Sequence, residues 1–225
     1  MQVELACRPA QAIAVVQLQP GESLVAEAGA LVAMSTAISL ETSTGGGILK
    51  GLKRMFGGET FFRNTFRATD RAGEVRLAPA LCGDMLHLDV SPGEDWLVQS
   101  GAFVASGSEV ELDTKLDGFR GFFSGAGIFV LKAHGRGPLV LGAFGAIVPV
   151  DVDGTFIVDT GHLVAWSPDL QFRVTKASEQ GWIASFLSGE GLIAEFSGKG
   201  RLWFQTRNPT DYGSLIGSML PPRAS

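Results

Sequence analysis

Hydrophobic residues in this chain come in short runs rather than in long helical stretches. In the run Met85-Leu86-His87-Leu88-Asp89, apolar and polar positions alternate, and other short, mostly apolar runs cover residues 75–77, 139–141 and 202–204. Alternating runs of about four to eight residues, bounded by turn residues, are typical of half-buried β-strands. The chain also has 30 glycines, about twice the usual share, which favours many turns. The pattern therefore predicts an all-β fold, either a sandwich or a barrel.

One stretch of the chain recurs three times. Pro-Gly-Glu at 20–22, followed by Gly-Ala-Leu-Val-Ala at 29–33, returns as Pro-Gly-Glu at 92–94 and Gly-Ala-Phe-Val-Ala at 101–105. In the third copy, Asp153-Gly154 replaces Pro-Gly-Glu, and Gly-His-Leu-Val-Ala follows at 161–165. Repeats of this kind let neighbouring units bury apolar faces that one unit cannot bury alone. We therefore expect a single compact all-β domain over 1–225, internally triplicated, whose copies close on one another in a pseudo-threefold arrangement.

The glycines of the repeat predict where the chain turns. Pro-Gly suits the centre of a type II turn, and Asp-Gly suits a tight hairpin turn, so each would connect two strands. Gly29, Gly101 and Gly161 are expected to supply positive φ at the following turn. If the three turns are equivalent, replacing each glycine with valine should cost a similar amount of stability.

Short helices are expected between the strand blocks of each copy. The candidates are 48–56, 116–123 and 177–187, which places the three repeats at about 11–78, 84–148 and 150–207. A C-terminal arm over 208–225 contains three prolines and a weak helical pattern around 212–219. The expected fold is thus strands and turns with a few short helices.

The first helix candidate forms a small basic amphipathic segment. Its apolar residues fall on one helical face, and its three basic residues lie elsewhere, a pattern that suits either an anionic membrane surface or a cover over the protein's own core. The equivalent segments of the other copies are apolar, and three such elements at one end would make a patch for oligomerisation or partner binding. The expected membrane or partner contacts are Ile48, Leu49, Lys50, Leu52, Lys53, Arg54, Phe56, Phe119, Phe122, Trp182 and Phe186.

Charge and cysteine content limit the possible functions. With 18 Lys and Arg against 23 Asp and Glu, the formal net charge is −5, which disfavours a general nucleic-acid binder. The longest uncharged stretch, 137–150, is interrupted by glycine and proline, so no membrane-spanning helix is expected. Cys7 and Cys82, without an export signal, predict two buried thiols in a cytoplasmic protein.

No catalytic signature is present, and neither a nucleophile motif nor a metal-ligand cluster with the right spacing occurs. Gly189-Glu190-Gly191 resembles part of a dinucleotide loop, but a predicted helix precedes it where a strand is required. His87 and Asp89 share one face of a strand and are the only metal-ligand candidates worth naming. We expect no cofactor and no enzymatic activity.

Several segments together resemble a known family. They are Gly-Gly-Gly-Ile-Leu-Lys-Gly-Leu-Lys-Arg at 45–54, Gly-Glu-Thr-Phe-Phe at 58–62, Gly-Ala-Phe-Val-Ala-Ser at 101–106 and Trp-Phe-Gln-Thr-Arg at 203–207. This combination resembles the altered-inheritance-of-mitochondria family, which is grouped structurally with the tryptophan-RNA-binding attenuation protein. The resemblance implies a double-stranded β-helix or β-sandwich and no enzyme activity. It also implies that mitochondrial members take part in inner-membrane organisation.

These observations favour a non-catalytic scaffold or binding protein that forms a homo-oligomer. Such a protein would be cytoplasmic and could attach peripherally to an anionic membrane or a membrane protein complex through the basic and apolar segments. The alternative is a small-ligand or metal-binding protein, or an enzyme, with a cupin-like pocket at His87 and Asp89. RNA binding is a minor alternative that rests on fold analogy alone.

Overall fold

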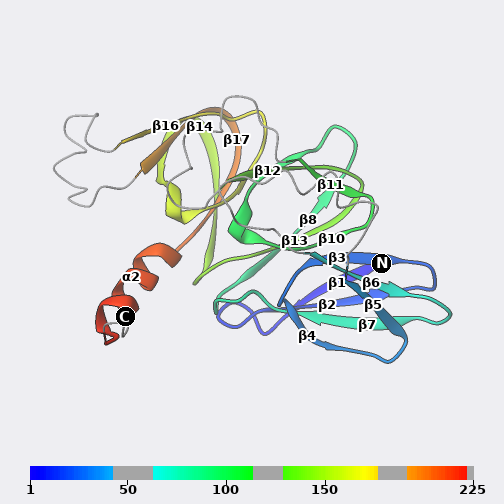
Figure 1. Cartoon of the computed structure of the whole chain (residues 1–225). Coiled ribbons are helices and arrows are strands. Elements are labelled where there is room, and N and C mark those ends of the chain that lie inside the picture. The colour runs from blue at the N-terminus through cyan, green and yellow to red at the C-terminus, as the bar shows by residue number, and fades with distance from the viewer. Residues whose placement is uncertain (43–62, 114–128, 177–191, 222–225) are drawn as a thin grey trace.

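The computed structural model describes residues 1–42, 63–113, 129–176 and 192–221, and these residues form a mostly β protein (Figure 1). The all-β prediction is confirmed. The N-terminal third contains β1 (Gln2–Ala6), β2 (Ile13–Leu18), β3 (Ser23–Glu27), β4 (Leu31–Met34), β5 (Ile38–Thr42), β6 (Arg63–Ala68) and β7 (Gly73–Leu77). The middle third contains β8 (Met85–Val90), β9 (Trp96–Gln99), β10 (Phe103–Gly107), β11 (Val110–Asp113), β12 (Val130–Gly135) and β13 (Gly137–Gly142). The last third contains β14 (Ile147–Asp159), β15 (Leu163–Trp166), β16 (Gln171–Lys176), β17 (Leu192–Gln205) and the helix α2 (Pro209–Met219).

The same strand pattern occurs three times along the chain. In the first copy β2 pairs with β7 and β3 with β6; in the second, β8 pairs with β13 and β9 with β12. In the third copy the two long strands β14 and β17 pair along their whole length and replace both of these ladders. We call these paired strands the ribbon of each copy. In each copy two further strands pair with the later strand or strands of the ribbon: β4 and β5 in the first copy, β10 and β11 in the second, and β15 and β16 in the third. The repeated letters of the sequence thus encode one repeated set of strand pairs.

Consecutive repeats are joined by strand pairing. The second repeat lays β10 against β3 of the first, with Ala105 opposite Ala26. The third lays β15 against β9 of the second in the equivalent way, with Ala165 opposite Val98. Because these ladders cross the repeat boundaries, the sheets run from one repeat into the next.

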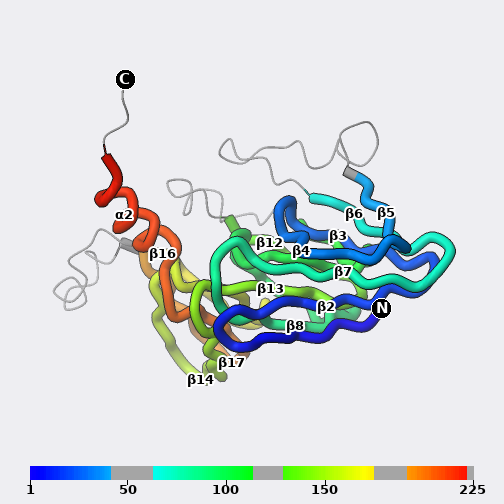
Figure 2. Tube along the Cα trace, turned by 90° about the horizontal axis from the view of Figure 1, so that it is seen from below, coloured from blue at the N-terminus to red at the C-terminus, as the bar shows by residue number. Residues whose placement is uncertain are grey.

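The expected closure of the three copies on one another is not observed. Among the described strands, those of the first repeat pair with no strand of the third. Figures 1 and 2 both place β4 well away from β14. The described repeats therefore form an open series with two ends, because only two of the three possible junctions between copies are made.

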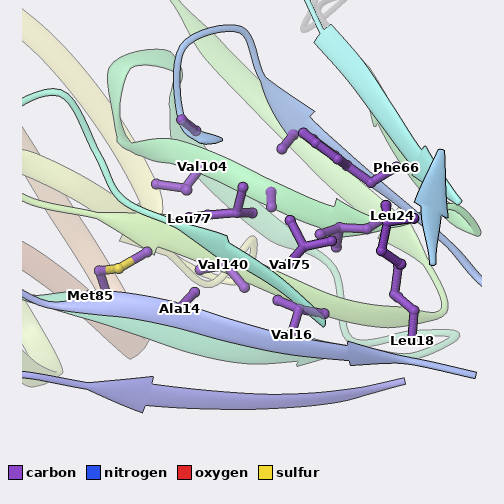
Figure 3. Close-up of a cluster of buried hydrophobic side chains, with 14 of the residues drawn as sticks. Ala14, Val16, Leu18, Leu24, Phe66, Val75, Leu77, Met85, Val104 and Val140 are labelled. Carbon is purple, nitrogen blue, oxygen red and sulfur yellow. The ribbon is translucent and has the colours of Figure 1, made fainter. Parts of the chain in front are cut away.

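Each repeat has a hydrophobic cluster to which an adjacent repeat contributes. Figure 3 shows the first cluster, in which Leu18, Leu24 and Phe66 of the first repeat lie with Val104 and Val140 of the second. The strand β10 serves two clusters, since Val104 packs into the first and Phe103 into the second. In the third repeat β15 repeats this arrangement, with Val164 in the second cluster and Leu163 in the third. The junctions between repeats are therefore apolar as well as hydrogen-bonded.

The turn predictions are confirmed in the first two copies and wrong in the third. Gly21 and Gly93 have φ of 86° and 91°, as the Pro-Gly turns require. Asp153-Gly154, predicted as a tight hairpin turn, lies inside the continuous strand β14, where Asp153 is opposite Lys199. The third copy has no proline at this place, so its backbone can keep every N–H in the ladder. The Pro-Gly pairs instead interrupt the ribbon and send β2 and β3, or β8 and β9, into different sheets.

The prediction of positive φ is confirmed only at Gly29, where φ is 93°. Gly101 and Gly161 are the middle residues of two 3-10 helices, η1 (Ser100–Ala102) and η2 (Thr160–His162), and neither has positive φ. The prediction is wrong there because these short helices make the same corner with ordinary backbone angles. At Gly161 the lack of a side chain leaves room for a neighbour instead, since an added Cβ would lie 2.4 Å from Asn208 Nδ2.

This difference gives unequal expected costs at the first two glycines. Gly29→Ala should lower the free energy of unfolding by about 1–2 kcal/mol, because a Cβ is unfavourable in the left-handed region. Gly101→Ala should change it by less than about 0.5 kcal/mol, because its backbone conformation suits any residue and only the end of the Gln99 side chain is nearby. Urea unfolding of both variants measures the difference. Equal losses would restore the equivalence that the sequence suggests.

Candidate interaction surfaces

His87 and Asp89 lie on one face of β8, as the alternation predicts. His87 Nε2 is 3.6 Å from Asp89 Oδ1, too far for a hydrogen bond, and the Asp89 side chain is 86% exposed. Within the described ranges no group of three or more His, Cys, Asp or Glu side chains is arranged to hold a metal ion. His87 is only 29% exposed, and two side chains alone supply too few ligands for a metal centre.

The basic and apolar segments expected to contact a membrane or partner lie outside the described residues. Trp182 and Phe186 of the third copy, Phe119 and Phe122 of the second, and the first-copy segment 48–56 all fall in the gaps. In the part of the chain that the structure describes, no helix is both long enough and apolar enough to cross a bilayer.

The two cysteines do not lie where the sequence predicts. Cys7 and Cys82 are free, but both are exposed rather than buried. Each follows or precedes a strand instead of lying within one, so neither is drawn into a hydrophobic cluster. The prediction of buried thiols is wrong because it took burial from residue type alone.

An ion pair between the half-exposed Arg8 and the buried Asp84 fixes the N-terminal segment to the start of the second repeat. The Arg8 guanidinium donates to both oxygens of Asp84, at 2.7 and 2.8 Å, and the backbone N–H of Met85 donates to Asp84 Oδ1 at 2.9 Å. The Asp84 side chain is only 5% exposed. The hydrogen bond from Arg8, with smaller contributions from Met85 and from the Arg8 charge, holds the pKa of Asp84 below its usual value against the opposing effect of burial. The polar groups here stabilise the start of the second repeat.

The Gln-Thr-Arg motif at 205–207 also has a structural role. The buried Gln205 side chain accepts a hydrogen bond from Phe144 N at 2.8 Å and donates to Gly161 O at 2.9 Å. Thr206 Oγ1 accepts from Ala146 N at 2.9 Å. These bonds connect the end of β17 with the segment that enters the third repeat and with η2. Gln205 and Thr206 therefore hold this junction together by hydrogen bonds.

Replacing Gln205 with leucine should destabilise the chain by about 1–3 kcal/mol, because the Phe144 N–H and the Gly161 carbonyl would lose their partner in a buried place. Thermal or urea unfolding measures the loss. The matched control is Gln171→Leu, at an exposed position of β16, which should change stability by less than about 0.5 kcal/mol. Equal effects of both substitutions would contradict the assigned role of Gln205.

The helix α2 carries an exposed apolar stripe. It begins after Asn208, whose side chain accepts from Thr210 N, and none of its residues is buried. In Figures 1 and 2 it projects from the sheets. Its large apolar side chains repeat at spacings of three and four, which places them on one face. They are Tyr212, Leu215, Ile216, Met219 and, just after the helix, Leu220. The Tyr212 ring contacts Phe144, with ring centroids 5.1 Å apart. The sequence predicts this helix but gives no sign that Leu215, Ile216 and Met219 are left exposed.

The edge strand β4 exposes a segment that is buried in the other two repeats. Val32 is 57% exposed, whereas its equivalents Val104 and Val164 are 1% and 0% exposed. Met34 is 40% exposed, although the residues at the same place in β10 and β15 are fully buried. The three segments have nearly the same sequence, so the difference comes from their neighbours. β10 and β15 each pair with a strand of the preceding repeat, whereas among the described strands β4 pairs only with β7.

The opposite end of the series is the C-terminal half of β14. Its residues are equivalent to β3 and β9, which receive β10 and β15 from the following repeat. Ile157 in this half is 38% exposed, while the equivalent Leu97 is 7% exposed. Among the described strands only β17 pairs with this part of β14. The two uncovered edges are thus the two halves of a junction that occurs twice within the chain.

Comparisons with known proteins agree with the fold and with the resemblance noted in the sequence. The model of a family described as mitochondrial biogenesis AIM24 matches residues 3–207. An uncharacterized protein of Streptococcus pyogenes serotype M6 is 29% identical over 216 residues, which cover 92% of this chain and 86% of the relative. The crystal structure of a Streptococcus pyogenes protein superposes with a TM-score of 0.78 at 24% identity and covers 97% of this chain and 99% of that one. This last likeness concerns the fold alone.

Proposed function

This chain belongs to the mitochondrial biogenesis AIM24 family, and we propose that within this family it is a non-catalytic scaffold that assembles with further copies of itself. The observation that carries the proposal is the exposure of Val32 and Met34 in a segment that both other repeats bury. A strand edge with exposed apolar side chains and no charged residue of its own favours pairing with another chain. Self-association would cover this edge.

Molar mass measured by light scattering over a range of protein concentrations tests the proposal. The wild-type chain should give a mass above that of one chain, and Met34→Lys should shift the midpoint of association to at least tenfold higher concentration. The matched control is Leu40→Lys on β5, because Leu40 is 41% exposed but occupies a different edge. A wild-type chain that stays monomeric at every concentration would refute the scaffold proposal.

Peripheral contact with an anionic membrane is a second candidate function, and the apolar face of α2 favours it. A helix with its apolar residues on one exposed face can lie in a membrane interface. The basic segment with Lys50, Lys53 and Arg54 would add attraction to anionic lipid, at about 1 kcal/mol for each basic residue near the surface. The two elements together would provide both kinds of membrane contact.

Co-sedimentation with anionic and neutral vesicles over a salt series tests membrane contact. Binding to anionic vesicles should weaken with salt, fall in the triple variant Lys50→Glu, Lys53→Glu and Arg54→Glu, and fall with Leu215→Ser combined with Met219→Ser. The double variant alters only exposed positions, so it should leave the fold intact. No sedimentation with either kind of vesicle would exclude this role.

The remaining alternatives have simple tests of their own. Metal that purifies with the protein and is lost on His87→Ala would favour the metal-binding alternative with its cupin-like pocket. RNA binding, the minor alternative, should produce salt-sensitive retention on poly-RNA. Elution that does not change with salt would remove it.

A further inference from the structure

We propose that copies of this chain join head to tail, with β4 of one copy paired to the C-terminal half of β14 of the next. This inference rests on the proposed self-association and specifies its geometry. The new junction would repeat, between chains, the two junctions that already connect the repeats within one chain.

The established junctions fix which surfaces must meet. In both junctions, the strand that follows the 3-10 helix of one repeat pairs antiparallel with a strand of the preceding repeat. These pairs are β10 with β3, and β15 with β9. The strand of the first repeat at this place is β4, and the matching partner in the third repeat is the C-terminal half of β14. Both lie at the edge of the described sheets.

The register of the proposed pairing follows from the internal ones. Ser106 is opposite Val25, and Trp166 is opposite Leu97. Met34 occupies the place of Ser106 and Trp166, and Ile157 occupies the place of Val25 and Leu97. The same register therefore puts Met34 opposite Ile157. These two side chains are 40% and 38% exposed in the isolated chain, so the pairing would cover one exposed apolar residue from each end.

The shape of β4 also matches that of its equivalents. Each of the three strands has a register shift at the same place against its inner neighbour, between Leu31 and Ala33, Phe103 and Ala105, or Leu163 and Ala165. A bulge at the same position bends each of these strands in the same way, so the strand edge that faces away from the inner neighbour has the same shape. β4 therefore already has the form that the internal junctions use.

Side-chain packing identifies a place for Val32 as well. Its equivalents Val104 and Val164 each insert into the cluster of the preceding repeat. In a head-to-tail pair, Val32 would enter the third cluster of the neighbouring copy, which contains Val158 and Phe196. Burial of this valine adds a hydrophobic contribution to the backbone pairing.

The two surfaces of this junction differ, so one copy leaves a free end of each kind. Contacts of this type produce a ring when the rotation between copies closes and an open filament when it does not. Either assembly contains the same β4–β14 junction.

Disulfide trapping between two single-cysteine chains tests the junction. In a background with Cys7→Ser and Cys82→Ser, which removes both exposed native thiols, a Met34→Cys chain and an Ile157→Cys chain are mixed and oxidised. Residues directly opposite in antiparallel strands lie within disulfide distance. The mixture should give at least tenfold more disulfide-linked heterodimer than a mixture of Leu40→Cys with Ile157→Cys.

The possible outcomes separate the junction from self-association in general. A heterodimer from Met34→Cys and Ile157→Cys supports the head-to-tail junction. If light scattering shows an oligomer but only Met34→Cys homodimers form, β4 pairs symmetrically with β4 of another copy. That result overturns the head-to-tail junction, while self-association stands. An oligomer that gives no cross-link at these positions overturns it too. A monomer at every concentration overturns both proposals.

Discussion

Trp166→Ala is expected to lower the free energy of unfolding by about 3–5 kcal/mol. Trp166 is fully buried in the third cluster. Its ring makes edge contacts with Phe172 at 5.0 Å and Phe196 at 5.5 Å between ring centroids. Alanine would remove these contacts and leave a cavity in the middle of the repeat. Urea unfolding measures the loss.

The matched control at this position is Trp166→Phe. Trp166 Nε1 is buried and lacks a hydrogen-bond partner among the described residues, so phenylalanine removes an unsatisfied donor while it keeps most of the aromatic packing. It should cost much less than alanine. If Trp166→Ala lost under about 1 kcal/mol, or if both variants lost equally, the third cluster would not be a well-packed core.

Asp84→Asn is expected to lower stability at neutral pH by about 1.5–3 kcal/mol, the range for a hydrogen bond to a charged group. Asparagine removes the charge opposite Arg8 and turns an N–H group toward one of the guanidinium donors that now bond to oxygen. The loss should appear as a lower midpoint in urea unfolding at pH 7.

The same substitution should change the pH dependence of stability. The folded chain holds the pKa of Asp84 below its ordinary value, so the carboxylate's contribution is fully present above the ordinary value of 3.8 and is lost as the pH falls through the lower folded pKa. The difference between wild type and Asp84→Asn should therefore shrink below about pH 4. Asp151→Asn is the control, because Asp151 makes a similar bidentate ion pair with Arg201 at the surface. This substitution should lower the free energy of unfolding by less than Asp84→Asn does. A larger loss at Asp151 would contradict the role of burial.

Much of the fold follows from the sequence because the three copies share recognisable amino-acid segments. The runs at 75–77, 139–141 and 202–204, predicted as strands, occupy equivalent positions in β7, β13 and β17. A short apolar run bounded by turn residues is enough to predict a strand without any knowledge of its partner. The helix at the C-terminus also follows from its pattern.

Other local features could not be predicted, because one residue type serves several purposes. Asp153-Gly154 can form a hairpin turn, but here it stays in a ladder because Lys199 and Gly198 continue the opposite strand. Gly101 and Gly161 share the place of Gly29 without sharing its φ. The sequence shows that glycine recurs at these positions. It does not show whether glycine is needed for its backbone angles or because a neighbouring group leaves no room for a Cβ.

The exposed edge of β4 could not be predicted from the sequence, for a different reason. Gly-Ala-Leu-Val-Ala at 29–33 and Gly-Ala-Phe-Val-Ala at 101–105 differ in one residue, yet one valine is exposed and the other buried. Exposure depends on which copy stands at the end of the series. That order becomes visible only when the strand pairing is known, and with it the expected closure proves absent among the described strands.

Hydrogen–deuterium exchange at low and high protein concentration tests self-assembly through the two uncovered edges. Peptides that cover β4 and residues 155–159 should exchange more slowly at high concentration, because pairing between copies protects their backbone N–H groups. The peptide that covers β5 should exchange at the same rate at both concentrations. Unchanged exchange in β4 and 155–159, at concentrations up to the highest that the protein tolerates, would contradict the claim.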